Sequence, residues 1–169
     1  MRHGIFLAIA VSIVALGGVY AMQNEAQAQS FIWPVPGCSN ITSPYGPRGT
    51  SGYVHSGTDI SCGRNEPILA AAAGTVVGMT YSSGQCSYSP SAGRCPVCDN
   101  SSGNSVTIDH GGGFKTSYLH LKSFGTGISK GAHVECGQQV GIMGTTGCST
   151  GTHLHFMVYK NGAHTNQMN

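Results

Sequence analysis

The sequence predicts an all-β protein built mainly from antiparallel sheet, with little helix outside its first 28 residues. The chain of 169 residues contains 26 glycines and many serines and threonines, and only 8% of its residues are charged. After residue 28, no stretch shows the 3.6-residue spacing of apolar side chains that marks an amphipathic helix. Short alternating segments separated by turn residues are present instead, which is typical of strands joined by tight turns.

The first half of the chain is predicted to supply an extended segment and two short strands. Prolines within residues 31–37 keep the residues before them out of the helical conformation, so this segment is expected to be extended. Residues 67–81 include a run of alanines, which favours helix, but the run is short and lies between Pro67 and Gly74. Two short strands broken at Gly74 are therefore predicted.

A hairpin is predicted next. Residues 104–110 alternate, with Val106 and Ile108 expected to face inward. The three glycines at 111–113 then turn the chain into a second strand over residues 115–121.

The C-terminal part is expected to complete the sheet. Residues 134–144 and 152–159 are predicted to supply further strands, and the pair Asn161-Gly162 is a strong turn signal. No internal repeat or linker divides the chain, so a single antiparallel β domain is expected.

The first 28 residues have the organisation of a secretory signal peptide. A basic start precedes an apolar run from Ile5 to Tyr20, and a small-residue cleavage site ends at Ala28. We expect cleavage there, which leaves residues 29–169 as one exported domain, periplasmic or extracellular. An uncleaved membrane anchor is the alternative, because the apolar run is long for a signal peptide.

The charge of the chain argues against a nucleic-acid partner. The formal net charge is only +2 at pH 7, and the lysines and arginines are scattered rather than clustered. Nucleic-acid binding depends on many cations that neutralise phosphates together. We expect a monomer that contacts neither nucleic acid nor, once the signal peptide is removed, the membrane.

Seven cysteines follow the leader, and in an exported protein they predict disulfide bonds. Cys38 with Cys62 and Cys136 with Cys148 are plausible local pairs, although sequence alone does not fix the connectivity. The odd thiol is expected among the other three, which are Cys86, Cys95 and Cys98.

The spacing of Cys95 and Cys98 also fits half of a zinc knuckle or a redox pair. A second cysteine pair at ligand spacing is missing, and the strand-then-helix setting of a thioredoxin active site is not apparent. A structural disulfide role is therefore favoured, within a glycine- and serine-rich loop over residues 82–103.

Two histidines near the C-terminus are placed for chemistry. In a strand over residues 152–159, His153 and His155 share one face about 7 Å apart, because successive side chains point to opposite sides. Leu154 and Phe156 occupy the other face and are expected to pack in the core. The histidine face is free to bind or react.

Two other segments carry residues of the metal-ligand type. His55 and Asp59 are four residues apart, with Gly57 between them favouring a turn into a strand over a helix. Alternation sets Tyr118 and His120 on one strand face, with the neighbouring leucines on the other. The remaining histidines after the leader are interpreted as ordinary hydrogen-bonded residues: His110, His133 and His164.

These segments together predict a catalytic metal site. Catalytic zinc typically takes three protein ligands of the His, Asp or Glu type and keeps a fourth position for water. His55, Asp59 and one histidine of the His153/His155 pair would complete such a set. A structural metal site is the alternative, but two spare histidines and the lack of an apparent fourth protein ligand favour catalysis.

The order of the motifs resembles a known family. The segments His55-x-x-x-Asp59, Tyr118-Leu-His120-Leu and Gly151-Thr-His153-Leu-His155-Phe resemble the zinc peptidases of the lysostaphin/LytM type, the M23 family of peptidoglycan endopeptidases. The similarity runs through nearly all of residues 29–169. Each motif alone is weak, whereas all of them in this order form a specific pattern.

The resemblance implies roles for five residues. His55, Asp59 and His155 would bind one zinc ion per chain, and His120 and His153 would be the catalytic histidines beside a zinc-activated water. The acidic residues outside the leader agree with a histidine base, because none except the proposed ligand Asp59 lies in a histidine motif. The unperturbed pKa of an imidazole, about 6.5, suits proton transfer near neutral pH, so turnover is expected to fall below roughly pH 6.

The chain also departs from the family pattern. Some members carry a tyrosine six residues before the first ligand as an oxyanion partner, and Gly49 stands there instead. Tyr45, Arg48 or Tyr53 are candidate substitutes. The segment from Cys86 to Cys98 looks like an insertion, and the tail after residue 162 lacks the usual closing proline segment.

Three other functions remain as alternatives. The segment 147–151 fits the G-x-S-x-G pattern of serine hydrolases around Ser149, but that motif needs a helix after it, and an alternating strand follows here. A non-catalytic LytM-like domain that binds cell wall or activates an amidase would typically lack ligands that this chain retains. A carboxypeptidase acting on peptide ends would use the same metal chemistry.

The function expected from the sequence is that of a secreted zinc metalloendopeptidase. It would hydrolyse peptide cross-links of bacterial peptidoglycan by zinc-activated water with the help of two histidines. Zinc is the expected cofactor and peptidoglycan peptides are the expected substrate.

Overall fold

The computed structural model describes residues 30–49, 52–63, 65–89, 95, 98 and 100–166. The expected signal peptide at 1–28 lies outside them, as do some residues of the expected 82–103 loop. The described residues form strands, turns and bends without any α-helix, which confirms the all-β prediction. Among them, no helix has the length and hydropathy needed to cross a membrane.

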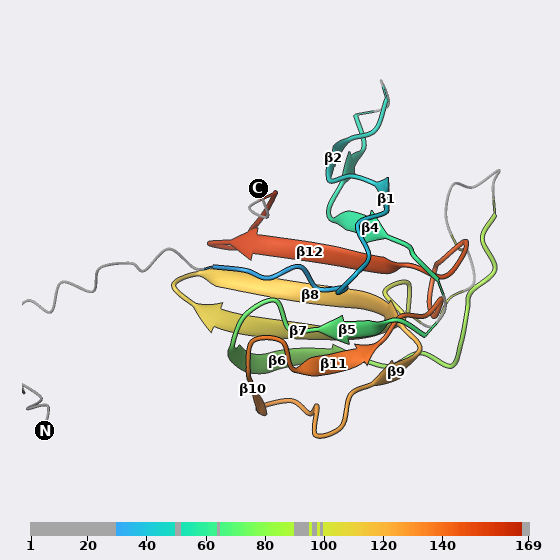
Figure 1. Cartoon of the computed structure of the whole chain (residues 1–169). Helices are drawn as coiled ribbons and strands as arrows, with labels where there is room; N and C mark the ends of the chain where they lie inside the picture. The colour runs from blue at the N-terminus through green and yellow to red at the C-terminus, as the bar shows by residue number, and fades with distance from the viewer. Residues whose placement is uncertain are drawn as a thin grey trace, which may run out of the picture.

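Most of the described strands belong to one antiparallel sheet (Figure 1). Eight strands form it within the described residues, and β13 (Ala163–Thr165) pairs with β12 beside the main path. Along that path the strands are β1 (Ile41–Ser43), β4 (Thr58–Ile60), β12 (Leu154–Lys160), β8 (Phe114–Leu121), β7 (Asn104–Gly111), β6 (Gly74–Thr80) and β10 (His133–Val134).

Two smaller sheets complete the described structure. A three-stranded sheet lies in front of the large sheet in Figure 1, and a two-stranded hairpin stands at one end. The first has the order β5 (Pro67–Leu69), β11 (Gln139–Ile142), β9 (Ser123–Phe124), and the second pairs β2 (Gly46–Pro47) with β3 (Val54–His55).

The hydrophobic core fills the space between the large sheet and the three-stranded sheet. Ile108, Leu154 and Phe156 enter it from the large sheet, and Ile68 and Val140 enter it from the smaller one. The predicted alternation explains this packing, because apolar residues two apart on a strand share one face. Burial of such side chains is worth about 1.5–3 kcal/mol each.

The predicted strands and turns are largely confirmed. The β7–β8 hairpin and the strand after residue 152 are present, and the turn at Asn161-Gly162 has φ angles of 51° and 82°. Two positive φ angles in succession explain the asparagine and glycine there. Residues 134–144 supply two short strands in different sheets, because a turn with a backbone hydrogen bond from Gln138 N to Glu135 O separates them.

The expected face of His120 is wrong. Ser105 lies opposite both Leu119 and His120, because the pairing shifts between β7 and β8 there. His120 also has a φ of 63°, which is unusual for a residue with a side chain. This β-bulge breaks the alternation, so Tyr118 and Leu121 both enter the core, while Leu119 and His120 both line a surface groove.

The disulfide pattern is partly as predicted. Cys38–Cys62 is confirmed, but Cys148 pairs with Cys95 instead of Cys136, whose thiol is free and exposed. Cys136 and Cys148 are close in sequence but lie at opposite ends of β11, so they do not meet. The remaining disulfide is Cys86–Cys98, so the expectation of an odd thiol among Cys86, Cys95 and Cys98 is wrong.

Candidate metal centre

Three strands bring together the side chains that were predicted as metal ligands. His55 ends β3, Asp59 lies in β4 and His155 lies directly opposite Asp59 in the register of β4 with β12. The Nδ1 atom of His155 is 2.7 Å from Asp59 Oδ1, and the Nε2 atom of His55 is 3.2 Å from the same oxygen. In the described part of the chain, this is the one group of three such donors that could hold a metal ion.

The surroundings of His55 and His155 fix how their rings present their nitrogens. His55 Nδ1 lies 2.9 Å from the carbonyl oxygen of Pro44, which can only accept, so this nitrogen carries the proton and Nε2 offers a lone pair. Gly57 packs against the ring of His155. A Cβ atom there would lie 2.8 Å from His155 Nε2 and 2.5 Å from Phe156 O, so only glycine fits this turn.

The predicted catalytic histidines lie beside the three donors. The ring centroids of His120 and His153 are 4.8 Å apart, and His153 Nε2 is 3.8 Å from Asp59 Oδ1. The Nδ1 atom of His120 is 2.8 Å from Thr146 O, and that of His153 is 2.8 Å from Gly151 O. Both Nδ1 atoms therefore donate to carbonyl oxygens, and both Nε2 atoms are available as bases.

The environment shifts the pKa values of His55, Asp59 and His120. Burial lowers the pKa of His120 to about 4, against the opposing effect of its hydrogen bond to Thr146. Burial likewise lowers the pKa of His55. For Asp59, burial acts to raise the pKa, but the hydrogen bond from His155 and the neighbouring imidazoles outweigh it, and the pKa lies below its ordinary value. A carboxylate with a lowered pKa, grouped with imidazole nitrogens, is a donor set that zinc binds.

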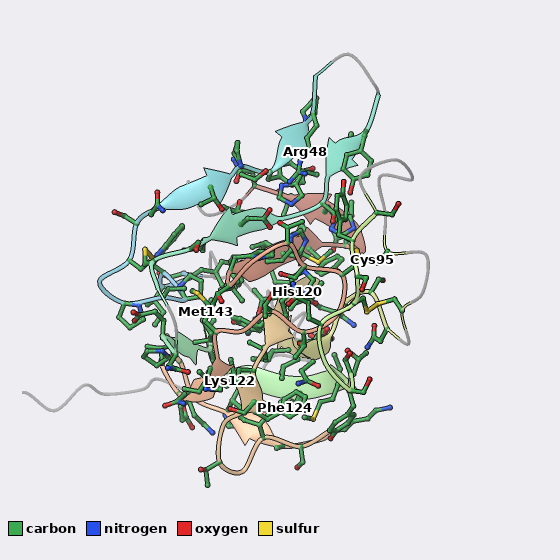
Figure 2. All side chains as sticks on the ribbon, turned by 90° about the vertical axis from the view of Figure 1, so that its right-hand side faces the viewer. Arg48, Cys95, His120, Lys122, Phe124 and Met143 are labelled. Atoms are coloured by element: carbon green, nitrogen blue, oxygen red, sulfur yellow. A yellow bond between two sulfur atoms is a disulfide. The ribbon has the colours of Figure 1, made fainter. Side chains whose placement is uncertain are left out.

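A groove of about 770 Å³ is bordered by the three proposed ligands and by both His120 and His153. Figure 2 shows this end of the sheet facing the viewer, with Arg48 above His120 and Cys95 to one side. Tyr53 and Tyr88 also line the groove, and each has an exposed side chain. Aromatic side chains therefore border the groove together with the histidines and Asp59.

A comparison with family models adds an independent observation. The model described as peptidase family M23 matches residues 53–167, which is more than half of the chain. The chain belongs to peptidase family M23.

Several M23 relatives are similar in sequence. The chain is 33% identical over 158 residues to the peptidoglycan DD-endopeptidase ShyA of Vibrio cholerae, covering 90% of this chain and 32% of that protein. It is 30% identical over 128 residues to the DD-carboxypeptidase/endopeptidase Mpg of Neisseria meningitidis, covering 73% of this chain and 25% of that protein. The chain spans about a third of the length of the first curated relatives that it matches.

Solved M23 structures share the fold. A zinc-containing peptidase from Vibrio cholerae superposes with a TM-score of 0.65 at 28% identity, covering 83% of this chain and 40% of that chain. A mutant of the catalytic domain of the prophage-encoded M23 protein EnpA from Enterococcus faecalis gives a TM-score of 0.60 at 29% identity. The match covers 76% of this chain and 88% of that one.

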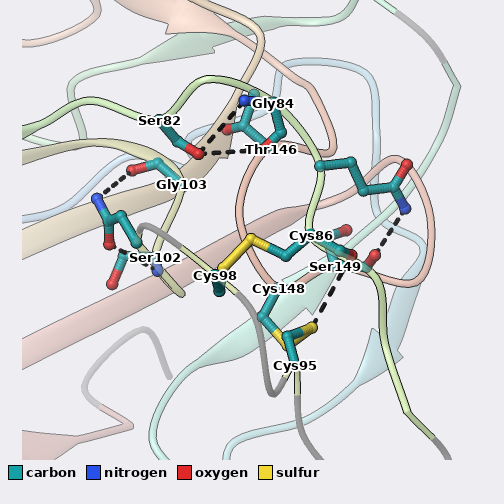
Figure 3. Close-up of a disulfide and its surroundings, with 12 residues drawn as sticks. Ser82, Gly84, Cys86, Cys95, Cys98, Ser102, Gly103, Thr146, Cys148 and Ser149 are labelled. Carbon is teal, nitrogen blue, oxygen red and sulfur yellow. Dashed lines mark hydrogen bonds between the residues drawn. A yellow bond between two sulfur atoms is a disulfide. The ribbon is translucent and has the colours of Figure 1, made fainter.

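The M23 groove of this chain has a cross-linked side wall. The disulfide Cys95–Cys148 joins the 82–103 segment to the loop between β11 and β12 (Figure 3). Hydrogen bonds add to this link: Gln85 Nε2 donates to Ser149 O at 2.7 Å, and Cys148 N donates to Ser101 O at 2.8 Å. The loop that they fix supplies the carbonyl oxygens that orient His120 and His153.

The three candidates to replace the tyrosine that some family members carry occupy different positions relative to the groove. Tyr45 is turned away, because its hydroxyl donates to the carbonyl oxygen of His164. Arg48 and Tyr53 both line the groove, and the φ of 57° at Gly49 matches the glycine found there. Sequence reasoning named these candidates but carried no signal for the carbonyl acceptors behind the histidines, because a backbone group has no sequence signature.

Ser149 does not have the setting of a serine nucleophile. It is buried, and its hydroxyl donates to Gly151 O at 2.7 Å. His153 Nδ1 lies 3.3 Å from the hydroxyl, but this nitrogen already donates to Gly151 O and cannot take the serine proton. The three histidines predicted to have ordinary roles lie outside the metal cluster: His110, His133 and His164.

Proposed function

We propose that this chain is a zinc metalloendopeptidase that hydrolyses peptide cross-links of bacterial peptidoglycan. The observation that carries the proposal is the convergence of His55, Asp59 and His155 beside two further histidines at one groove. M23 relatives named as peptidoglycan endopeptidases support the substrate class.

The donor set fits zinc. His55 would bind through Nε2, Asp59 through Oδ1 and His155 through Nδ1, because these atoms face one another. A zinc ion bound there would act as a Lewis acid toward the scissile carbonyl and lower the pKa of water.

The neighbouring histidines would move the protons. His120 and His153 turn their Nδ1 atoms to carbonyl oxygens and present their Nε2 atoms to the groove, so one can accept a proton from the attacking water and deliver it to the leaving amine nitrogen. The protonated imidazole also stabilises the negative charge that develops on the carbonyl oxygen. Burial keeps His120 uncharged at neutral pH, since its pKa is lowered to about 4.

We further propose that residues 1–28 are a cleaved signal peptide and that residues 29–169 act as a monomeric exported domain. Three disulfides support an oxidising compartment such as the periplasm or the cell exterior. N-terminal sequencing of the exported protein would place the cleavage site, and a chain retained in the membrane with an intact start would show an anchor instead.

The deciding experiment combines metal content with product analysis. The exported protein is expected to contain one zinc per chain and to release amino groups from purified peptidoglycan. A protein that binds zinc but releases no amines would be a binding or regulatory domain. Mass spectrometry of the products distinguishes cleavage inside a cross-link from loss of a terminal residue, which a carboxypeptidase would give.

A further inference from the structure

The carboxylate of Asp59 has different partners on its two oxygens. Oδ1 faces the donor atoms of His55 and His155. Oδ2 lies 3.4 Å from the Nη2 atom of Arg48, and the same nitrogen donates to Ser43 Oγ at 2.6 Å. One oxygen is therefore directed to the metal site and the other to a cation outside it.

The fold builds this arrangement from neighbouring strands. Ser43 in β1 lies opposite Asp59 in β4, and its hydroxyl is also 3.4 Å from His55 Nδ1. Arg48 follows β2, and its backbone N–H donates to Tyr53 O at 2.8 Å, which closes the β2–β3 hairpin. The guanidinium therefore reaches the carboxylate from a hairpin whose end carries His55.

Arg48 also lies where two hollows meet. It lines the main groove and an adjoining hollow of about 470 Å³, and Asp59 and His153 border both. Its side chain is 45% exposed, so as an ion pair alone it would contribute little stability. Asp59, in contrast, is only 16% exposed, so the guanidinium can restrict how that carboxylate turns.

We propose that Arg48 is a positioning residue that holds Oδ2 of Asp59 and so directs Oδ1 alone to the metal. This inference rests on the proposed zinc site. Without the guanidinium, the carboxylate is free to rotate and to offer both oxygens, which weakens the preorganised site and uses a coordination position that hydrolysis needs. Partners that orient a ligand commonly contribute 10–100-fold, by order of magnitude, to metal affinity.

The test measures zinc affinity by competition with a chelator of known affinity. Arg48→Ala is expected to weaken binding by about 10- to 100-fold. Arg48→Lys should recover part of this loss, because an ammonium retains the charge but lacks the planar fork of donors. Lys115→Ala is the matched control: Lys115 is 46% exposed and pairs with Asp109 at 3.1 Å on the β7–β8 hairpin, so its removal should leave zinc affinity within about twofold.

The cobalt-substituted protein provides a second readout. In Arg48→Ala, the visible absorption bands of bound cobalt should weaken, because an added carboxylate oxygen raises the coordination number. Thermal unfolding of the metal-free variants shows that each one folds.

The outcomes separate the two proposals. Wild-type zinc affinity and an unchanged cobalt spectrum in Arg48→Ala would overturn the positioning role. A loss of turnover with unchanged affinity would also overturn it, because Arg48 would then act on the substrate directly. A wild-type protein that binds neither zinc nor cobalt would instead overturn the proposed metal site itself.

Discussion

The groove holds its proposed metal ligands and its proposed catalytic histidines by different means. The proposed ligands Asp59 and His155 are held by strand pairing toward one edge of the large sheet, where β4 and β12 lie side by side, and His55 ends β3. The proposed catalytic residues His120 and His153 depend on carbonyl oxygens of the loop between β11 and β12, which is tied down by a disulfide. We call the ligand set His55, Asp59 and His155 the floor, and we call His120 and His153 the rim.

This difference separates binding from catalysis. The floor needs the register of β4 with β12 and the end of β3, and the core packs against the large sheet. The rim needs a bulge, a loop and a cross-link to be formed together. Changes to the floor should therefore remove the metal, whereas changes to the rim should leave the metal and impair turnover.

Asp59→Ala should have the largest effect. It removes the carboxylate to which both ligand imidazoles point, so zinc content is expected to fall to background. Loss of a Lewis acid worth several kcal/mol corresponds to a fall in turnover of about 10³-fold or more. Elemental analysis and amine release measure both quantities, and full zinc occupancy in this variant would refute the ligand assignment.

His120→Gln and His153→Gln should separate the rim from the floor. Each variant is expected to retain one zinc per chain but to lose about 10²- to 10⁴-fold in turnover, the usual contribution of a general acid or base. The matched control is Ser149→Ala, which removes a buried hydroxyl of the same loop without removing an imidazole. Near-normal turnover in either histidine variant would exclude that residue from the mechanism, and a complete loss in Ser149→Ala would revive the serine hydrolase alternative.

Removal of the Cys95–Cys148 disulfide should give an intermediate effect. The double variant Cys95→Ser/Cys148→Ser is expected to lose about 2–4 kcal/mol of unfolding free energy and to keep its zinc. Because the loop that orients His120 and His153 loosens, turnover should fall on the order of 10- to 100-fold. Denaturant unfolding and kinetics at saturating zinc measure the two effects.

The control for this double variant is Cys136→Ser, since Cys136 is a free and exposed thiol. It should leave stability and turnover unchanged. If the double variant kept wild-type turnover, the disulfide would not support the rim.

Sequence patterns predicted the floor better than the rim. Alternation in β12 predicted that Leu154 and Phe156 would enter the core and that His155 would face away from it. The motif around His55 and Asp59 predicted a turn into a strand, as found. These features depend on local periodicity, which a sequence displays directly.

The rim depended on long-range contacts that a sequence does not display. The β-bulge at His120 arises from the pairing of β8 with β7, and neither strand signals it alone. Cys148 was expected to pair with Cys136, its neighbour in sequence, but its partner is 53 residues away. The contact between Arg48 and Asp59 likewise requires three strands to be in place before it can form.

The smallest expected effect is a pH dependence of stability caused by burial of His120. Its pKa is about 4 in the folded chain against about 6.5 when unfolded, so the unfolded state takes up the proton first as the pH falls. In the metal-free protein, the contribution of uncharged His120 to the free energy of unfolding is fully present above about pH 6.5. It is lost as the pH falls toward 4. Between pH 7.5 and pH 5 the loss should be about 2 kcal/mol.

Urea unfolding of metal-free protein at both pH values measures this loss. His120→Gln should reduce it and leave only the part due to other groups such as His55, whose pKa burial also lowers. His133→Gln, a change at an exposed ring next to Glu135, should leave it in place. A loss in the wild-type protein no larger than the loss in His120→Gln would show that the His120 imidazole is not buried in solution. The same low pKa keeps His120 available as a base well below pH 6, so a fall in turnover near pH 6 would have to come from another group of the site.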